Sequence, residues 1–371
     1  MLRFVRLVFN DWVFMSRADG HRAGNRADMH EQASGRSGAA MYGGLYAALD
    51  LGTNNCRLLM ARPSRDGFRV VDAFSRIVRL GEGLGSTRRL AEDAIQRTID
   101  ALKICSNKMA QRGVNRARLI ATEACRAAEN SDDFMGRVEA ETGLKLEIID
   151  RETEAALAAA GCAALADPKA ESVVLFDIGG GSTEIVWLDA ACEGRRSISK
   201  RMRSWTSLPV GVVTLSERHG GREVSYQSYQ GMVDEVQNHL REFAAALPGS
   251  AQPAHFHLLG TSGTVTTLAG VHLGLPRYDR RAVDGIWMSS DQVSTIVSRL
   301  LAMSYPERVQ SACIGTERAD LVLAGCAILD GIRNVFPSDR VRVADRGLRE
   351  GILMQLMVED GVWPDPLAGA A

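Results

Sequence analysis

The feature that most constrains this chain is a short pattern that occurs twice, an aspartate two residues before a glycine at the turn of a predicted hairpin. Asp50-Leu-Gly52 and Asp177-Ile-Gly179 lie 127 residues apart. Each follows a short apolar strand, and a second apolar strand returns from the turn. A period this long is not that of a solenoid, and it predicts two related α/β domains that face each other across a cleft.

The patterns between these turns alternate strands with helices. Strands are predicted at Tyr46–Asp50, Cys56–Ala61, Phe68–Phe74, Ala117–Ala121, Lys145–Ile149, Ser172–Phe176, Glu184–Leu188 and near 197–210, 255–260 and 341–345. Helices are predicted near 91–112, around Phe134 and Val138, from Arg151, from Val265, and near 231–246, 290–303 and 318–333. At about 150 residues per domain, 371 residues allow two domains and a remainder.

The domain boundaries follow from these patterns. We predict one domain at 41–165, a second at 166–360 and a flexible tail at 361–371. Residues 1–40 contain six arginines and no lysine, and they lack a signal-peptide pattern. They are interpreted as a disordered extension or as the product of a misassigned start, with Met41 as the true first residue. A membrane-surface anchor is the minor alternative.

The charge balance excludes several classes of protein. Lysine and arginine total 44 and aspartate and glutamate total 45, so the chain is neither a globally basic nucleic-acid wrapper nor a charge-dominated disordered chain. No uncharged apolar run is long enough for a transmembrane helix. Seven scattered cysteines without a C-x-x-C pair favour a reducing compartment, so we expect a cytoplasmic protein without nucleic-acid or membrane partners.

The segment Phe176-Asp-Ile-Gly-Gly-Gly-Ser-Thr-Glu184 carries the most chemical information. Consecutive glycines let the backbone approach an oxyanion and direct several N–H groups towards it. Asp177 and Glu184 could hold Mg²⁺, partly through water. The alternative for this segment alone is a tight hairpin in which Asp177 bonds the turn amides.

Two further loops favour phosphate binding over that alternative. Asp50-Leu-Gly-Thr-Asn-Asn55 offers a carboxylate, turn amides and the side chain of Asn54. Leu259-Gly-Thr-Ser-Gly-Thr264 follows a strand and begins a helix, whose free amides attract anions. Three such loops in this order predict a phosphoryl-transfer site.

These segments resemble those of the exopolyphosphatase / guanosine pentaphosphate phosphatase (Ppx/GppA) family, within the actin / sugar-kinase / Hsp70 superfamily. The matching segments cover about residues 46–356 and read ALDLGTNNCRLLMA, ATEACRAAEN, IIDRETEAAL, FDIGGGSTEIV, LLGTSGTVTTLAG and ADRGLREGIL. The resemblance implies two actin-like (ribonuclease H-like) α/β domains with mixed sheets flanked by helices and an active-site cleft between them.

The resemblance also implies a role for each matching residue. Glu154 matches the catalytic glutamate that orients and deprotonates water, and Arg126 matches an arginine that can pair phosphate oxygens. Asp177 and Glu184 match the metal-associated acids. The matches to the phosphate loops are Asp50, Thr53, Asn54, Gly179, Gly180, Ser182, Ser262 and Thr264. On its residues alone, Glu154 is better interpreted as an exposed acid in the first turn of a helix.

The chain departs from the family pattern at three places. Asn55 stands where serine is more frequent, Ala156 where a basic residue is frequent, and Asp150-Arg151 where Ser-Gly is frequent. The chain also stops shortly after GLREG, as the short, two-domain members do.

Five cations lie close together at Arg195, Arg196, Lys200, Arg201 and Arg203. They are either a solvated hairpin or a surface that attracts a polyphosphate tail.

The sequence therefore predicts a Mg²⁺-dependent phosphohydrolase. Its expected substrates are inorganic polyphosphate, at the terminal phosphate, and guanosine pentaphosphate, at the 5′-terminal phosphate. A kinase or ATP-binding member of the same superfamily and a non-catalytic alarmone sensor are the alternatives. The family resemblance also allows a homodimer.

Overall fold

The computed structural model describes residues 44–65, 67–189, 201–247 and 256–362. The predicted extension at 1–40, most of the predicted tail, and Arg195, Arg196 and Lys200 of the basic hairpin lie outside these residues. The other two cations of that hairpin both donate to Asp189. Arg201 bonds the backbone carbonyl of Asp189 at 3.0 Å, and Arg203 bonds the carboxylate of Asp189.

The first sheet has five strands in the order β3-β2-β1-β4-β5. They are β1 (Tyr46–Leu51), β2 (Asn55–Ser64), β3 (Gly67–Ile77), β4 (Arg116–Ala121) and β5 (Glu147–Ile148). β1 is antiparallel to β2 and parallel to β4, so the sheet is mixed. β1 is buried along most of its length, as a central strand requires.

The second sheet repeats this plan with six strands in the order β10-β11-β9-β6-β7-β8. They are β6 (Ser172–Ile178), β7 (Thr183–Asp189), β8 (Met202–Leu208), β9 (Phe256–Thr261), β10 (Trp287–Ser289) and β11 (Arg340–Ala344). β6 corresponds to β1, because it pairs antiparallel with the next strand, β7, and parallel with β9. The two D-x-G turns thus join matched strands in matched sheets.

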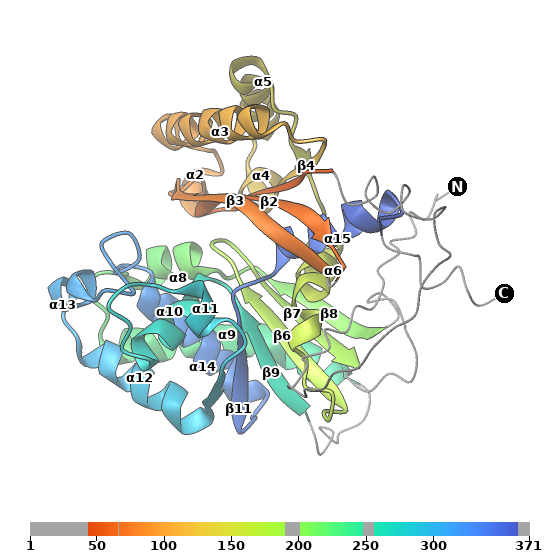
Figure 1. The fold of residues 1–371 in the computed structure, drawn as a ribbon. Helices are drawn as coiled ribbons and strands as arrows, with labels where there is room; N and C mark the ends of the chain where they lie inside the picture. The colour runs from red at the N-terminus through yellow and green to blue at the C-terminus, as the bar shows by residue number, and fades with distance from the viewer. Residues whose placement is uncertain (1–43, 66, 190–200, 248–255, 363–371) are drawn as a thin grey trace, which may run out of the picture.

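Helices cover both faces of each sheet (Figure 1). They are α2 (Leu84–Thr87), α3 (Glu92–Arg112), α4 (Glu123–Ala127), α5 (Ser131–Thr142), α6 (Arg151–Cys162), α8 (Val212–His219), α9 (Tyr226–Ala246), α10 (Gly263–His272), α11 (Arg280–Val283), α12 (Ser290–Ala302), α13 (Tyr305–Gln310), α14 (Val322–Val335) and α15 (Leu348–Glu359). A 3₁₀ turn, η1 (Ala163–Leu165), follows α6.

Two helices lie between the sheets and pack against each other (Figure 1). α6, from the first half of the chain, contacts β7 and β8 of the second sheet, whereas α15, near the end of the chain, packs on β1 and β2 of the first. An ideal Cβ on Gly161 of α6 would lie 2.0 Å from the carbonyl oxygen of Gly347, and one on Gly351 of α15 would lie 2.0 Å from that of Leu157. Glycine at these positions therefore lets the two helices cross in backbone contact.

Most predicted elements are present, with shifted ends. The predicted strand at Lys145–Ile149 is only the two residues of β5, and the helix expected near 318–333 begins at Val322. The mixed sheets flanked by helices are confirmed, whereas the domain boundaries stay a prediction. In the part of the chain described above, no helix is both long and apolar enough to cross a membrane.

Candidate active site

A cavity of about 120 Å³ lies where the two D-x-G turns meet. Of the predicted site residues, only Arg126 is absent from its lining. The residues that line it are Asp50, Thr53, Asn54, Glu154, Asp177, Gly179, Gly180, Ser182, Glu184, Ser262 and Thr264. They come from both halves of the chain, so the fold brings together the three loops that the sequence predicted.

The two turns have the same backbone hydrogen bond. Gly52 donates to the carbonyl of Asn55 at 2.9 Å, and Gly179 donates to the carbonyl of Ser182 at 2.9 Å. The turns also touch each other, because an ideal Cβ on Gly180 would lie 2.9 Å from the Cβ of Thr53. The missing side chain at Gly180 is therefore what allows the two phosphate turns to meet.

Burial strongly perturbs the carboxylates of the cavity. Burial raises the pKa of Asp177 to about 7, and the nearby charges of Glu184 and Asp50 add to this shift. Burial likewise raises the pKa of Asp50, against the lowering effect of Arg57. It raises the pKa of Glu184, although Ser207 and Ser182 donate hydrogen bonds to that carboxylate at 2.8 and 2.9 Å. The acidic side chains that line the cavity thus outnumber the basic side chains that could offset their charge.

Glu154 lies in the first turn of α6, whose N-cap Asp150 accepts a hydrogen bond from the amide of Thr153 at 2.7 Å. It is only 9% exposed, so it is not the solvated first-turn acid that its residue pattern allowed. Burial raises its pKa well above the ordinary value, and the charge of Glu184 raises it further. Arg126 opposes the shift by donating to Glu154 Oε2 at 2.7 Å. A buried carboxylate facing a phosphate-binding cavity can orient a water molecule and accept a proton from it.

The third loop lines the cavity and begins α10. Ser262 has φ of 124°, in the left-handed region, and its hydroxyl caps the helix by accepting from the amide of Thr264 at 3.2 Å. Arg318 lies beside this loop and donates to Thr267 Oγ1 at 3.0 Å. A helix N-terminus and a guanidinium together favour an anion.

The residues present fit a divalent cation bound together with substrate. The amide oxygen of Asn54 is buried without a hydrogen-bond partner, and an ion or water would satisfy such an atom. Among the described residues, no three Asp, Glu, His or Cys side chains converge into a site made of protein ligands alone. Mg²⁺ usually takes one or two carboxylates and completes its shell with water and substrate phosphates. Asp177 and Glu184 suit that mode of binding.

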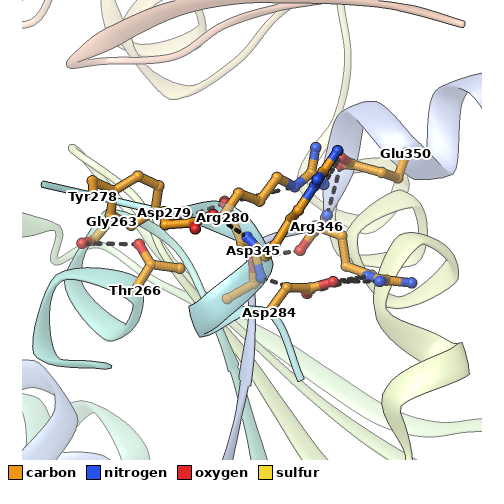
Figure 2. A network of polar contacts seen from close by, with 12 residues as sticks. Gly263, Thr266, Tyr278, Asp279, Arg280, Asp284, Asp345, Arg346 and Glu350 are labelled. Atoms are coloured by element: carbon orange, nitrogen blue, oxygen red, sulfur yellow. Dashed lines mark hydrogen bonds and ion pairs between the residues drawn. The ribbon is translucent and has the colours of Figure 1, made fainter. Parts of the chain in front are cut away.

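A network of charged side chains supports the turn from β11 into α15 beside the site (Figure 2). Arg280 donates to Glu350 at 2.7 Å, and Tyr278 donates to Asp345 at 2.6 Å. Glu350 also accepts from the amide of Gly347 at 2.9 Å, which holds the first turn of α15. In the segment GLREG, the last glycine, Gly351, allows close helix packing and the glutamate fixes the turn.

Sequence reasoning missed three charged residues that line the cavity, Arg57, Glu123 and Arg318. Arg57 is opposite Asp50 in the strand register, as Glu184 is opposite Asp177. Aligning the two halves of the repeat would have found Arg57. Glu123 and Arg318 lie outside the repeated pattern, so no comparable signal marks them.

Contacts between residues outside the cavity lining also join the two halves of the chain. Arg79 binds both oxygens of Asp320, at 2.8 and 3.0 Å, and the amide of Gly83 donates to Glu217 at 2.8 Å. The segment that carries Arg79 also donates amides to the first phosphate turn, including that of Gly81 to the carbonyl of Thr53 at 2.9 Å. The phosphate turn is therefore tied to residues that join the two halves of the chain.

Comparison with known proteins agrees with this geometry. The model of the Ppx/GppA phosphatase family matches residues 60–359. The chain is 28% identical to exopolyphosphatase 2 of Mycobacterium tuberculosis, over 84% of this chain and 98% of that protein. It is 27% identical to a guanosine-5′-triphosphate,3′-diphosphate pyrophosphatase of Photobacterium profundum, over 84% of this chain and 59% of that protein. The chain spans about half the length of the longer curated relatives it matches.

A solved structure shows the same architecture. The Aquifex aeolicus member of the Ppx/GppA family aligns over 86% of this chain and 99% of its own, with 28% identity and a TM-score of 0.69. The resemblance found in the sequence motifs is thereby confirmed, and so is the actin-like two-domain fold. The family match covers strands of both sheets and the second and third loops of the cavity, and this chain belongs to the Ppx/GppA phosphatase family.

Proposed function

We propose that this chain is a phosphohydrolase that removes the terminal phosphate of inorganic polyphosphate or the 5′-terminal phosphate of guanosine pentaphosphate. One observation carries the proposal: the buried carboxylate of Glu154 shares a single cavity with the three phosphate-type loops. Membership of the Ppx/GppA family supports this reaction, and relatives named for both substrates match the chain.

Each part of the cavity has a task in the reaction. The turns at Thr53 and Gly180 and the start of α10 hold phosphate oxygens through backbone amides and small hydroxyls. Glu154 orients the attacking water and accepts its proton. A Mg²⁺ ion held by Asp177 and Glu184 would offset the charge of the transferred phosphoryl group. Positioning and electrostatics supply most of the catalysis in such reactions.

The kinase and sensor alternatives have less support. The relatives reported above are named for phosphate hydrolysis, and none is named as a kinase. Consumption of ATP only in the presence of a second acceptor would instead indicate a kinase. Tight binding of guanosine pentaphosphate without phosphate release in excess Mg²⁺ would indicate a sensor.

The first test measures phosphate release from long polyphosphate, short polyphosphate and guanosine pentaphosphate side by side. The variant Glu154→Gln keeps the side-chain shape and removes the base. We expect kcat to fall by at least about 100-fold, the range typical of a lost general base. Glu152→Gln, an exposed glutamate on the same turn of α6, is the matched control and should keep kcat within about twofold of the original. Equal activity in both variants would refute the role of Glu154.

Mg²⁺ dependence, a homodimer and a cytoplasmic location stay predictions. Chelation of divalent ions should abolish phosphate release, and added Mg²⁺ should restore it, because the buried acids of the cavity need a counter-charge when the phosphate arrives. Full activity in the presence of a chelator would contradict the metal requirement.

A further inference from the structure

The guanidinium of Arg126 does not line the cavity, although its sequence motif predicted a phosphate ligand. It donates from Nη2 to Glu154 at 2.7 Å and to Glu123 at 2.9 Å, from Nε to Glu123 at 3.1 Å, and from Nη1 to the carbonyl of Ile149 at 2.8 Å. A guanidinium has five N–H donors in a rigid fork. Four of them are engaged here, so little of Arg126 is left for a substrate.

Glu123 in turn is held from outside. Arg151, the first residue of α6, donates to Glu123 Oε1 at 2.8 Å and to Oε2 at 3.2 Å. The side chains of Glu123 and Arg126 are each 13% exposed, whereas that of Arg151 is 47% exposed. The four side chains thus form a row of contacts with alternating charges, Arg151–Glu123–Arg126–Glu154, in which both glutamates line the cavity and Arg151 reaches solvent.

This row also joins two short elements. Glu123 and Arg126 lie on α4, whereas Ile149, Arg151 and Glu154 lie at or just before the start of α6. α4 has only five residues and could not hold its own position without such contacts. The row therefore fixes the distance between α4 and the turn of α6 that carries Glu154.

We propose that Glu123, anchored by Arg151, is a positioning residue that holds Arg126 on Glu154, so that Arg126 orients the base instead of binding the substrate phosphate. This proposal rests on the proposed function. Arg151 occupies one of the positions at which this chain departs from the family pattern, and the structure gives that departure a partner in Glu123. If Arg126 turned into the cavity, Glu123 would keep Arg151, but the buried carboxylate of Glu154 would lose the cation that bonds it, which is costly.

The kinetic test separates positioning from phosphate binding. We expect Glu123→Gln and Arg126→Lys to lower kcat by about tenfold or more with KM changed by less than about threefold, because a misplaced base slows chemistry without weakening binding. The inhibition constant of inorganic phosphate should stay within the same threefold range. A phosphate-binding Arg126 predicts the opposite: Arg126→Lys would raise both constants, and Glu123→Gln would lower them by releasing the guanidinium.

Matched controls come from a second bidentate pair. Arg118 donates to both oxygens of Glu147, each at 3.0 Å, at the edge of the first sheet and away from the cavity. Glu147→Gln and Arg118→Lys should leave kcat and KM within about twofold of the original. Equal falls in kcat in these variants and in the test variants would show that the effect is structural, and it would overturn the proposal.

A double-mutant cycle tests the route through Glu123. Because Arg151 acts only by holding Glu123, Arg151→Gln should lower kcat on its own by about threefold or more. It should add less than about twofold when Glu123 is already Gln. Independent, multiplicative effects would contradict the row of contacts.

One measurement does not depend on catalysis, so it separates failure of this proposal from failure of the proposed function. In protein labelled with ¹⁵N-arginine, the Nε–H signal of Arg126 is identified by its loss in Arg126→Lys. The proposal predicts a signal that keeps its position when inorganic phosphate and Mg²⁺ are added and shifts or broadens in Glu123→Gln. A phosphate-dependent shift that matches the binding isotherm would overturn it, even in a chain without phosphatase activity.

Discussion

In the first hairpin Asp50 is opposite Arg57, whereas in the second hairpin the matched residue Asp177 is opposite Glu184. The backbone is the same in both, with one turn hydrogen bond of 2.9 Å in each. The first hairpin therefore pairs its acid with a base, and the second pairs its acid with another acid. One repeated plan has produced a half that offsets its own charge and a half that needs a cation from outside.

The largest expected effect of this difference is on how the free energy of unfolding depends on pH. The pKa of Asp177 is about 7 in the folded chain and 3.8 when unperturbed, so between these values the folded state binds more protons than the unfolded state. The contribution of Asp177 to the free energy of unfolding should therefore be largest below about pH 4, and it should fall as the pH rises to about 7. Asp177 alone contributes up to about 4 kcal/mol to that fall in the absence of metal.

Urea unfolding at several pH values measures this slope. Asp177→Asn should flatten it, and saturating Mg²⁺ should flatten it in the original chain, because a bound cation favours the ionised carboxylate. An unchanged slope in Asp177→Asn would contradict the assignment of the excess charge to the second hairpin.

The next effect is on catalysis at the matched positions. Glu184→Gln removes the second acid but keeps a side chain that can bond Ser182 and Ser207, and we expect kcat with Mg²⁺ to fall by about 100-fold, or about 2.7 kcal/mol. Arg57→Gln removes a cation from the cavity lining and should mainly raise KM, by about tenfold. Steady-state kinetics at several Mg²⁺ concentrations distinguish them. If both variants lost kcat equally, the two hairpins would share one role.

The smallest effect concerns the turns. An ideal Cβ on Gly179 would lie 2.8 Å from the carbonyl oxygen of Ser182, whereas one on Gly52, the matched glycine, would lie 3.7 Å from that of Asn55. Gly179→Ala should therefore cost about 2 kcal/mol of unfolding free energy, and Gly52→Ala less than about 1 kcal/mol. Unfolding midpoints in urea measure both. A larger loss in Gly52→Ala would reverse the comparison.

The sequence predicted those parts of the fold that local patterns encode. The hairpins around Asp50 and Asp177 were predictable because apolar strands and D-x-G turns mark each of them. α15 was not predicted as a helix, because most of Leu348–Glu359 is buried between two sheets and its apolar residues spread around the helix instead of forming one stripe. β5 is shorter than the predicted strand because only Ile120 and Ala121 of β4 pair with it.

The candidate site was predicted unevenly for a similar reason. Residues of the three loops were identifiable because each loop has glycines at a strand end. The partners of Arg126 were not, since Glu154 lies 28 residues away along the chain and meets it only through the packing of α4 on the start of α6. The motif match predicted that Arg126 binds phosphate oxygens, whereas the direction in which its side chain points depends on the tertiary structure around it.

The crossing of α6 and α15 has a consequence for how such a chain can evolve. Gly161 and Gly351 are distant in sequence, yet neither can gain a side chain unless the two helices separate. Separation would move the start of α6, and with it Glu154, relative to both sheets. Mutational drift at this crossing is therefore restricted to paired changes, although none of these glycines lines the cavity. The last glycine of GLREG thus serves the space available between two helices, although it is not part of the cavity lining.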